Sequence, residues 1–240
     1  MKLRQHQLTS WVVNIITIGA AGVFIGSILW RVLMPNVSAI AKTLTVRIDG
    51  ANSGSGTLIE DLGVGAIAPR EHRYLVLTNW HVVSEHLDPP AAFTLATSDG
   101  RQHRVLTQKI ARVGKLDLAI LEFRSRDRYP VATLGNSDRL TEGDALYVSG
   151  WADPSPQLSI RTYQFLVGNL SGRIDRDRDG YSLVYTVSAL PGMSGGPVLD
   201  RWGNLVGING RATVDLRTGT VNSVLGIDIN RYLRTRGDIP

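Results

Sequence analysis

The sequence predicts a mostly β protein, a barrel or sandwich, behind an apolar N-terminal segment. Short runs of alternating apolar and polar residues begin at residue 42, and no convincing long helix interrupts them. The 25 glycines and 10 prolines supply turns between these runs. With 43% hydrophobic and 20% charged residues the chain can bury a core, and the absence of cysteine excludes a disulfide scaffold and a thiol nucleophile.

The first predicted element is a membrane-spanning helix at Trp11–Trp30. Its twenty residues carry no formal charge, and a helix of that length spans about 30 Å, the thickness of the hydrocarbon core of a bilayer. We expect residues 1–10 to be cytoplasmic, residues 11–30 to form the anchor and residues 31–42 to form a stalk. The remainder then lies on the extracytoplasmic side, periplasmic or luminal. The alternative is a cleaved signal, because an A-x-A pattern ends at Ala41, and cleavage there gives a secreted protein.

The net charge of +5 arises mainly beside this apolar segment. Residues 1–41 contain three basic and no acidic residues, which leaves 23 basic and 21 acidic residues in the rest of the chain. Such a nearly balanced charge does not favour nucleic acid as a partner.

The predicted strands follow in chain order, each bounded by glycine, proline, asparagine or aspartate. They are Thr43–Ile48, Gly56–Ile59, Tyr74–Thr78, Ala92–Thr97, Leu118–Phe123, Ala145–Ser149, Leu183–Val187, Val198–Leu199, Leu205–Ile208 and Val224–Ile229. We expect one helical turn at His81–His86 and a short helix at Asn230–Arg236.

Three separated residues carry the chemistry. Ser194 lies in the segment PGMSGGP, whose glycines allow a tight turn with an exposed hydroxyl and converging backbone N–H groups. A serine hydroxyl needs an adjacent base, and His81 stands where a strand gives way to a helical turn. Asp117 leads into the apolar run DLAIL, where its carboxylate can orient another polar group. Each alone is an ordinary turn or cap residue, but their order and contexts together favour catalysis.

Four motifs resemble those of trypsin/chymotrypsin-like serine proteases, above all the bacterial HtrA (Deg) branch. They are GSGTLI at Gly54–Ile59, LTNWHVV at Leu77–Val83, DLAIL at Asp117–Leu121 and GMSGGPVLD at Gly192–Asp200. The resemblance covers about residues 42–233. It implies an all-β fold of two six-stranded antiparallel barrels, at residues 43–130 and 131–240, with the catalytic cleft between them. No PDZ domain is expected.

The same resemblance implies a serine endopeptidase that works through an acyl-enzyme intermediate. Ser194 is the nucleophile, His81 the general base and Asp117 the group that orients His81. The backbone N–H groups of Gly192 and Ser194 form the oxyanion hole. Met193 replaces the aspartate that trypsin uses in zymogen activation, so no such switch is expected. Whether the oxyanion loop is pre-formed stays open.

The resemblance also suggests where the side chain before the scissile bond binds. The expected pocket walls are Ser188, Ala189, Leu190, Ile208, Asn209 and Gly210. They carry no charge, which favours small or medium apolar side chains. Asp228 lies on the same strand face as Gly226. If that face lines the pocket, Lys or Arg is favoured; otherwise Asp228 is solvated or hydrogen-bonded.

No metal or cofactor is expected. Asp175–Tyr181 copies the opening of a calcium loop, but the twelfth position is Thr186 instead of glutamate. The expected partners are polypeptide substrates, the membrane through the N-terminal helix, and a possible second copy of the chain. The alternatives to a protease are a non-catalytic binding module with the same fold (a pseudoprotease) and a serine hydrolase that acts on esters.

Overall fold

The structure, a computed structural model, describes residues 34–50, 52–65, 70–84, 93–105, 109–175, 177–214 and 221–236. The chain divides into two compact units, Met1–Pro35 and Asn36–Pro240. The span expected at Trp11–Trp30 lies outside the described residues. Within the described ranges, every helix is too short or too polar to cross a bilayer.

The second unit contains the folded elements. The helices are α2 (Val37–Leu44), α3 (Trp80–Val83), the 3-10 turn η3 (Ser137–Arg139) and α4 (Ile229–Arg236). The strands of its first half are β1 (Thr45–Asp49), β2 (Gly54–Val64), β3 (His72–Thr78), β4 (Thr94–Ala96), β5 (Gln102–Arg104), β6 (Ala111–Arg112) and β7 (Ala119–Ser125). Those of its second half are β8 (Ala145–Ala152), β9 (Thr162–Arg173), β10 (Leu183–Tyr185), β11 (Pro197–Leu199), β12 (Leu205–Val214) and β13 (Val221–Asp228).

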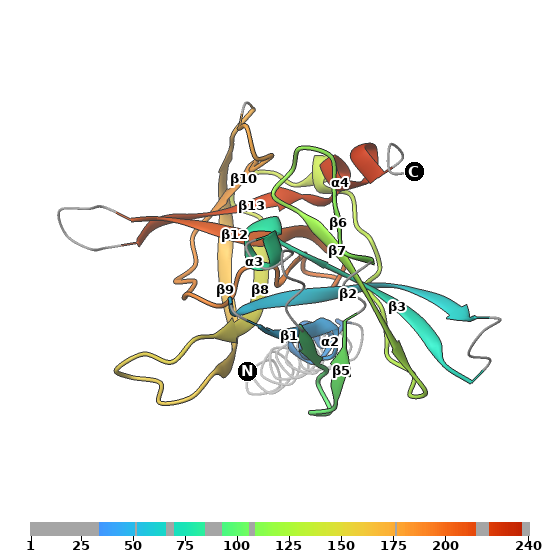
Figure 1. Cartoon of the computed structure of the whole chain (residues 1–240). Coiled ribbons are helices and arrows are strands. Elements are labelled where there is room, and N and C mark those ends of the chain that lie inside the picture. The colour runs from blue at the N-terminus through green and yellow to red at the C-terminus, as the bar shows by residue number, and fades with distance from the viewer. Residues whose placement is uncertain are drawn as a thin grey trace, which may run out of the picture. The chain divides into compact units, whose positions relative to one another are not determined.

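The first half is a seven-stranded antiparallel sheet in the order β5-β4-β1-β2-β3-β7-β6 (Figure 1). Bulges between β2 and β3 increase its twist, and the sheet wraps around a core that includes Ile48, Leu58 and Phe123. The expectation of a closed six-stranded barrel is wrong here. β5 and β6 have only three and two residues, and within the described residues each pairs on one side only, which leaves a half-barrel.

The second half is a closed six-stranded barrel, as expected, in the order β10-β13-β12-β11-β8-β9. β8 and β9 pair over the whole length of β8, and β12 and β13 form a long hairpin (Figure 1). Its interior includes Leu146, Val148 and Val198, which alternate with outward residues as a barrel strand requires.

Helix α2 occupies the end of the segment where a stalk was expected. Val37, Ala41 and Leu44 fall on one helical face and are buried. The Asn36 side chain caps the helix by accepting a hydrogen bond from Ala39 N at 3.1 Å. The first strand therefore begins at Thr45 rather than Thr43.

A shared apolar cluster joins the two halves. Leu77 and Leu118 of the first half pack in it with Leu205, Ile208 and Ile227 of the second. Because this cluster is buried, it holds together the segments that precede His81 and Asp117 and the strands beside Ser194.

Candidate active site

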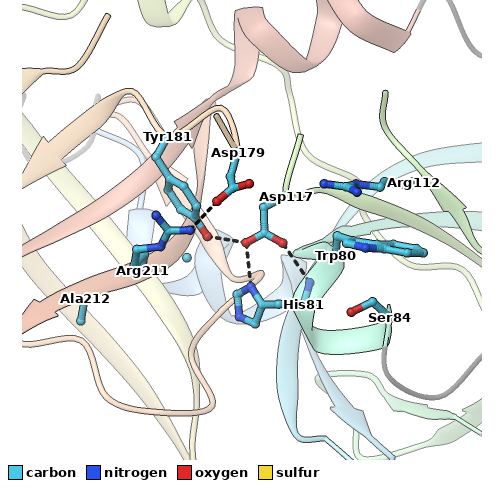
Figure 2. Close-up of a pocket in the computed structure, with 10 residues that line it drawn as sticks. Trp80, His81, Ser84, Arg112, Asp117, Asp179, Tyr181, Arg211 and Ala212 are labelled. Atoms are coloured by element: carbon cyan, nitrogen blue, oxygen red, sulfur yellow. Dashed lines mark hydrogen bonds and ion pairs between the residues drawn. The ribbon is translucent and has the colours of Figure 1, made fainter. Parts of the chain in front are cut away.

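His81 and Asp117 form a hydrogen-bonded pair at one wall of a cavity of about 500 Å³ (Figure 2). His81 lies in the single turn α3 directly after β3, and Asp117 lies just before β7, the strand that pairs with β3. His81 Nδ1 lies 2.7 Å from Asp117 Oδ2, and His81 N donates to Asp117 Oδ1 at 2.9 Å. Asn79 Nδ2 donates to the Asp117 carbonyl at 2.9 Å, which fixes the backbone of the pair. With Nδ1–H donated to the carboxylate, Nε2 is left as the basic nitrogen.

Asp117 is held as a carboxylate. It is only 7% exposed, and this burial by itself raises its pKa. Hydrogen bonds from His81 and Tyr181 outweigh burial, so the pKa of Asp117 lies below its ordinary value. Tyr181 donates from its hydroxyl to Asp117 Oδ2 at 2.6 Å. The charge therefore persists near neutral pH, where it can stabilise an imidazolium.

Ser194 lies at the tight turn before β11. Gly195 has a φ of +90°, and an added Cβ there would lie 2.0 Å from the Ser55 carbonyl oxygen, so only glycine fits. Ser194 Oγ donates to the Gly210 carbonyl at 2.9 Å. Within the described residues no hydrogen bond joins Ser194 Oγ to His81. Gly210 lines the same cavity as His81, so the hydroxyl lies beside that cavity and must turn to reach the imidazole.

The backbone around Ser194 is fixed through its carbonyl groups. Pro191 O accepts from Asp153 N at 2.8 Å, and Met193 O accepts from Asn209 Nδ2 at 3.0 Å. In a trans peptide unit the N–H points opposite to the C=O, so the N–H groups of the next residues, Gly192 and Ser194, point away from these anchors. Neither N–H donates a hydrogen bond within the described part of the chain. Two fixed, unused donors next to a serine can bind an oxyanion.

Arg161 ties this loop to the first half. Its guanidinium donates to the Ile48 and Gly54 carbonyl oxygens, each at 2.9 Å, and to Trp151 O at 3.1 Å. Its Nε lies 3.1 Å from Asp153 Oδ1. Because Asp153 N also holds the Pro191 carbonyl, Arg161 indirectly supports the loop that carries Gly192 and Ser194.

The expected pocket residues lie in different environments. Ile208 is fully buried, and Asn209 is 2% exposed with its amide held between Tyr185 and Met193. Ala189 is buried, whereas Ser188 and Leu190 are exposed. Gly210 lines the cavity. Of these six residues, only Ser188, Leu190 and Gly210 therefore present substantial accessible surface.

Asp228 is not aimed at this site. Its carboxylate is buried and accepts hydrogen bonds from Ser182 Oγ at 2.7 Å, Ser137 Oγ at 3.1 Å and Arg231 N at 2.8 Å.

The fully buried Met193 packs against Gly150, where an added Cβ would lie 2.8 Å from the Met193 Cβ. Met193 thus fills an apolar space in the second half, where no ion pair can form.

Sequence reasoning missed Tyr181, Arg161 and Ser55. Tyr181 directly follows the aspartate-rich turn, and Ser55 lies inside a motif that was recognised as a whole. Neither position signals on its own that its hydroxyl reaches the other half. Within the described residues, no group of histidine, aspartate and glutamate side chains has the arrangement of a metal site.

Comparison with known proteins finds a family that matches most of the chain. Residues 44–208 match the family described as trypsin-like peptidase domain. The chain is 28% identical over 182 residues to the serine protease Do-like HtrA of Bacillus subtilis (strain 168), covering 72% of this chain and 37% of that protein. It is 26% identical over 168 residues to the Homo sapiens serine protease HTRA4, covering 68% and 31%. The chain spans about a third of the length of these curated relatives.

Solved structures show the same fold. The HtrA-type protease AlgW with a tripeptide superposes with a TM-score of 0.64 at 24% identity, covering 85% of this chain and 62% of that one. Deg5 superposes with a TM-score of 0.62 at 20% identity, covering 83% of this chain and 90% of that one.

Proposed function

This chain belongs to the family of trypsin-like peptidase domains, and from that premise we propose that it is a serine endopeptidase of the HtrA type. The observation that carries the proposal is the Asp117–His81 pair, which lines the same cavity as Gly210, the residue whose carbonyl accepts the Ser194 hydroxyl. The substrate class we propose is polypeptide, and no cofactor is required.

In the proposed mechanism, Ser194 Oγ leaves the Gly210 carbonyl, turns toward His81 and attacks the carbonyl carbon of the scissile bond. His81 Nε2 accepts the hydroxyl proton and then donates it to the leaving amine, which leaves an acyl-enzyme. Asp117 keeps the imidazole oriented and stabilises its protonated form. The N–H groups of Gly192 and Ser194 donate to the oxyanion, and the loss of one such donor typically costs about 2.7–4 kcal/mol. Water hydrolyses the acyl-enzyme by the same steps.

The test compares the wild-type chain with Ser194→Ala. We expect a fluorophosphonate probe to label the wild type alone, and only the wild type to digest an unstructured protein such as casein. Labelling that persists in Ser194→Ala, or no labelling under any condition, would overturn the proposal; the second result favours a non-catalytic binding module. Labelling with turnover of esters but not peptides favours an ester hydrolase.

We further propose that cleavage follows apolar rather than basic residues. The Asp228 carboxylate is already bonded to two serine hydroxyls and a backbone N–H, so it is not available to a substrate cation. Leu190, 40% exposed, supplies apolar surface beside the nucleophile. Digestion of a peptide library should give small or medium apolar residues before the cut, and a preference for Lys or Arg there would contradict this assignment.

Membrane tethering through Trp11–Trp30, with the peptidase unit on the extracytoplasmic side, is also proposed. The support is the uncharged twenty-residue run. We expect the full chain to stay in membranes after a carbonate wash. Externally added protease should digest the peptidase unit of intact cells only after the extracytoplasmic compartment has been opened. Release of the full chain by carbonate would contradict the tether.

A further inference from the structure

Tyr181 lies between β9 and β10 in the second half, yet its hydroxyl reaches the carboxylate of the first half (Figure 2). It donates to Asp117 Oδ2 at 2.6 Å, the same oxygen that lies 2.7 Å from His81 Nδ1. The Tyr181 side chain is fully buried. The oxygen that orients the imidazole is therefore shared between a histidine of one half and a phenol of the other.

The surroundings of Tyr181 hold its ring in place. The Arg211 guanidinium lies over the ring, 4.5 Å from its centroid, and donates to Asp179 Oδ2 at 2.7 Å. The Asp179 carbonyl in turn accepts from Asp117 N at 2.8 Å. Arg211 also lies 3.8 Å from Asp177, so one guanidinium pairs with two carboxylates of this aspartate-rich turn. The turn is thus built to present the phenol to Asp117.

Gly210 makes room for this contact. A Cβ added at Gly210 would lie 2.5 Å from the Tyr181 hydroxyl, so any side chain there would displace the phenol. The Gly210 carbonyl also accepts the Ser194 hydroxyl at 2.9 Å. Gly210 therefore contacts both the Ser194 hydroxyl and the Tyr181 phenol, the group that binds Asp117.

We propose that Tyr181 is a positioning residue for the proposed catalytic site: its hydrogen bond fixes the Asp117 carboxylate from the opposite half and thereby aligns His81. The inference rests on the proposed function for its catalytic meaning. Tyr181 touches no reacting atom and acts through Asp117. Its bond also draws negative charge from the oxygen that stabilises the imidazolium, so it weakens that stabilisation while improving orientation.

Tyr181 stays a donor throughout. Burial is the largest cause that raises the pKa of its phenol, and the Asp117 charge adds to it. The other charged groups that line the cavity around the His81–Asp117 pair are Arg112 of β6, Asp179 of the β9–β10 connection and Arg211 of β12. None of them hydrogen-bonds the Asp117 carboxylate within the described residues, which leaves Tyr181 as the group to test.

The experiment uses the full chain carrying Tyr181→Phe, with Tyr129→Phe as the matched control. Tyr129 also donates its hydroxyl to an aspartate, Asp99 at 3.2 Å, but neither residue lines the cavity beside His81. Titration of the His81 ring is followed by NMR in a Ser194→Ala background, and hydrolysis is measured with Ser194 present. We expect Tyr181→Phe to move the His81 titration and the acid limb of kcat/KM to higher pH, because Asp117 Oδ2 then keeps more of its negative charge beside the imidazolium. We also expect kcat to fall about 10-fold with KM little changed.

A second variant guards against a merely structural effect. Gly210→Ala keeps the phenol but displaces it, and should shift the His81 titration in the same direction. An unshifted titration in folded Tyr181→Phe, or an equal shift in Tyr129→Phe, overturns the inference. Because the NMR readout does not need turnover, an inactive wild type overturns the proposed function alone.

Discussion

The two halves hold their parts of the candidate site in different ways. In the first half, a one-turn helix and a strand end carry His81 and Asp117, and side-chain hydrogen bonds align the pair. In the second half, a closed barrel carries Ser194, and backbone carbonyl groups with fixed partners align its loop. Changes in the second-half loop should therefore abolish activity outright, whereas changes in side-chain contacts should give graded losses.

Gly195→Ala should have the largest effect. The φ of +90° is strained for alanine, and its Cβ would lie 2.0 Å from Ser55 O and 2.3 Å from Thr78 Oγ1 of the first half. We expect kcat/KM to fall more than about 1,000-fold and the free energy of unfolding to fall by about 2–5 kcal/mol. Peptide hydrolysis and urea denaturation measure the two.

Gly143→Ala is the matched control. Its φ is +92°, but an added Cβ meets nothing within 4 Å. Only the backbone strain of about 1–2 kcal/mol should appear, with unchanged kcat/KM. Equal losses of activity in both variants would show that strain, and not contact with the first half, governs the loop.

Asn209→Ala should come next. The change removes the hydrogen bond to Met193 O and leaves the Tyr185 hydroxyl without its partner at 2.8 Å. Because Met193 O then keeps only the hydrogen bond from Gly196 N at 3.2 Å, the peptide that presents the Ser194 N–H is held less firmly, and kcat/KM should fall about 10- to 100-fold. The affinity for a peptide boronate should fall in parallel, since a boronate would occupy the proposed oxyanion site.

The control for that change is Asn204→Ala in the β11–β12 turn. Its amide bonds only to Asp200 within the described structure, at 3.0 Å. Activity should stay at the wild-type level. If Asn209→Ala raised KM for the substrate but left the affinity for the boronate unchanged, Asn209 would form a wall of the substrate pocket instead of holding the loop that carries Ser194.

The parts of the site that sequence reasoning could predict are those with local signatures. The glycines around Ser194 are needed by the turn itself, as the positive φ of Gly192 and Gly195 shows. Tyr181 had no such signature, because its partner lies 64 residues away and the contact depends on how the halves dock. The role of Gly210 could not be predicted for the same reason. A side chain at Gly210 would collide with the Tyr181 phenol, which comes from another loop.

The fold likewise contains features with a local sequence signature and features that depend on distant contacts. The closure of the second barrel was expected and is confirmed, but the openness of the first half was not, because it depends on whether the short strands β5 and β6 find partners. Helix α2 carries a readable cap and apolar face. The β-branched Thr43 near its end and Thr45 directly after it made the segment resemble a strand instead.

Ser55→Ala should give a smaller, graded loss. This first-half hydroxyl donates to Gly192 O and accepts from Trp151 N, each at 2.8 Å, so it joins two backbone groups of the second half. At about 1 kcal/mol for such a bond, kcat/KM should fall about 5-fold. Ser171→Ala removes a comparable bond, to Val184 O at 3.0 Å, within the second half alone and should leave kcat/KM unchanged. A loss as large as that of Asn209→Ala would contradict the graded behaviour of side-chain contacts.

The smallest effect concerns an ion pair that lies wholly in the first half. Arg73 on β3 donates to both oxygens of the buried Glu122 on β7, at 2.8 and 3.0 Å. The hydrogen bond from Arg73 is the main cause that lowers the pKa of Glu122. The stabilisation is therefore complete above the unfolded pKa of about 4.3 and is lost as pH falls through the folded value. Because the Arg73 side chain is 35% exposed, solvent reduces the free energy that the ion pair contributes to stability.

Arg73→Gln should accordingly lower the free energy of unfolding at pH 7 by about 1–2 kcal/mol without changing kcat/KM. Urea denaturation between pH 3 and 7 should show a weaker loss of stability on acidification than in the wild type, because the variant has less Glu122 stabilisation to lose. Arg126→Gln, which breaks the exposed pair with Glu71 at 3.6 Å, should change stability by less than about 0.5 kcal/mol. A fall in kcat/KM in Arg73→Gln would mean that the loss of an ion pair between β3 and β7 disturbs His81. The alignment of His81 would then depend on the whole sheet of the first half and not only on its own hydrogen bonds to Asp117.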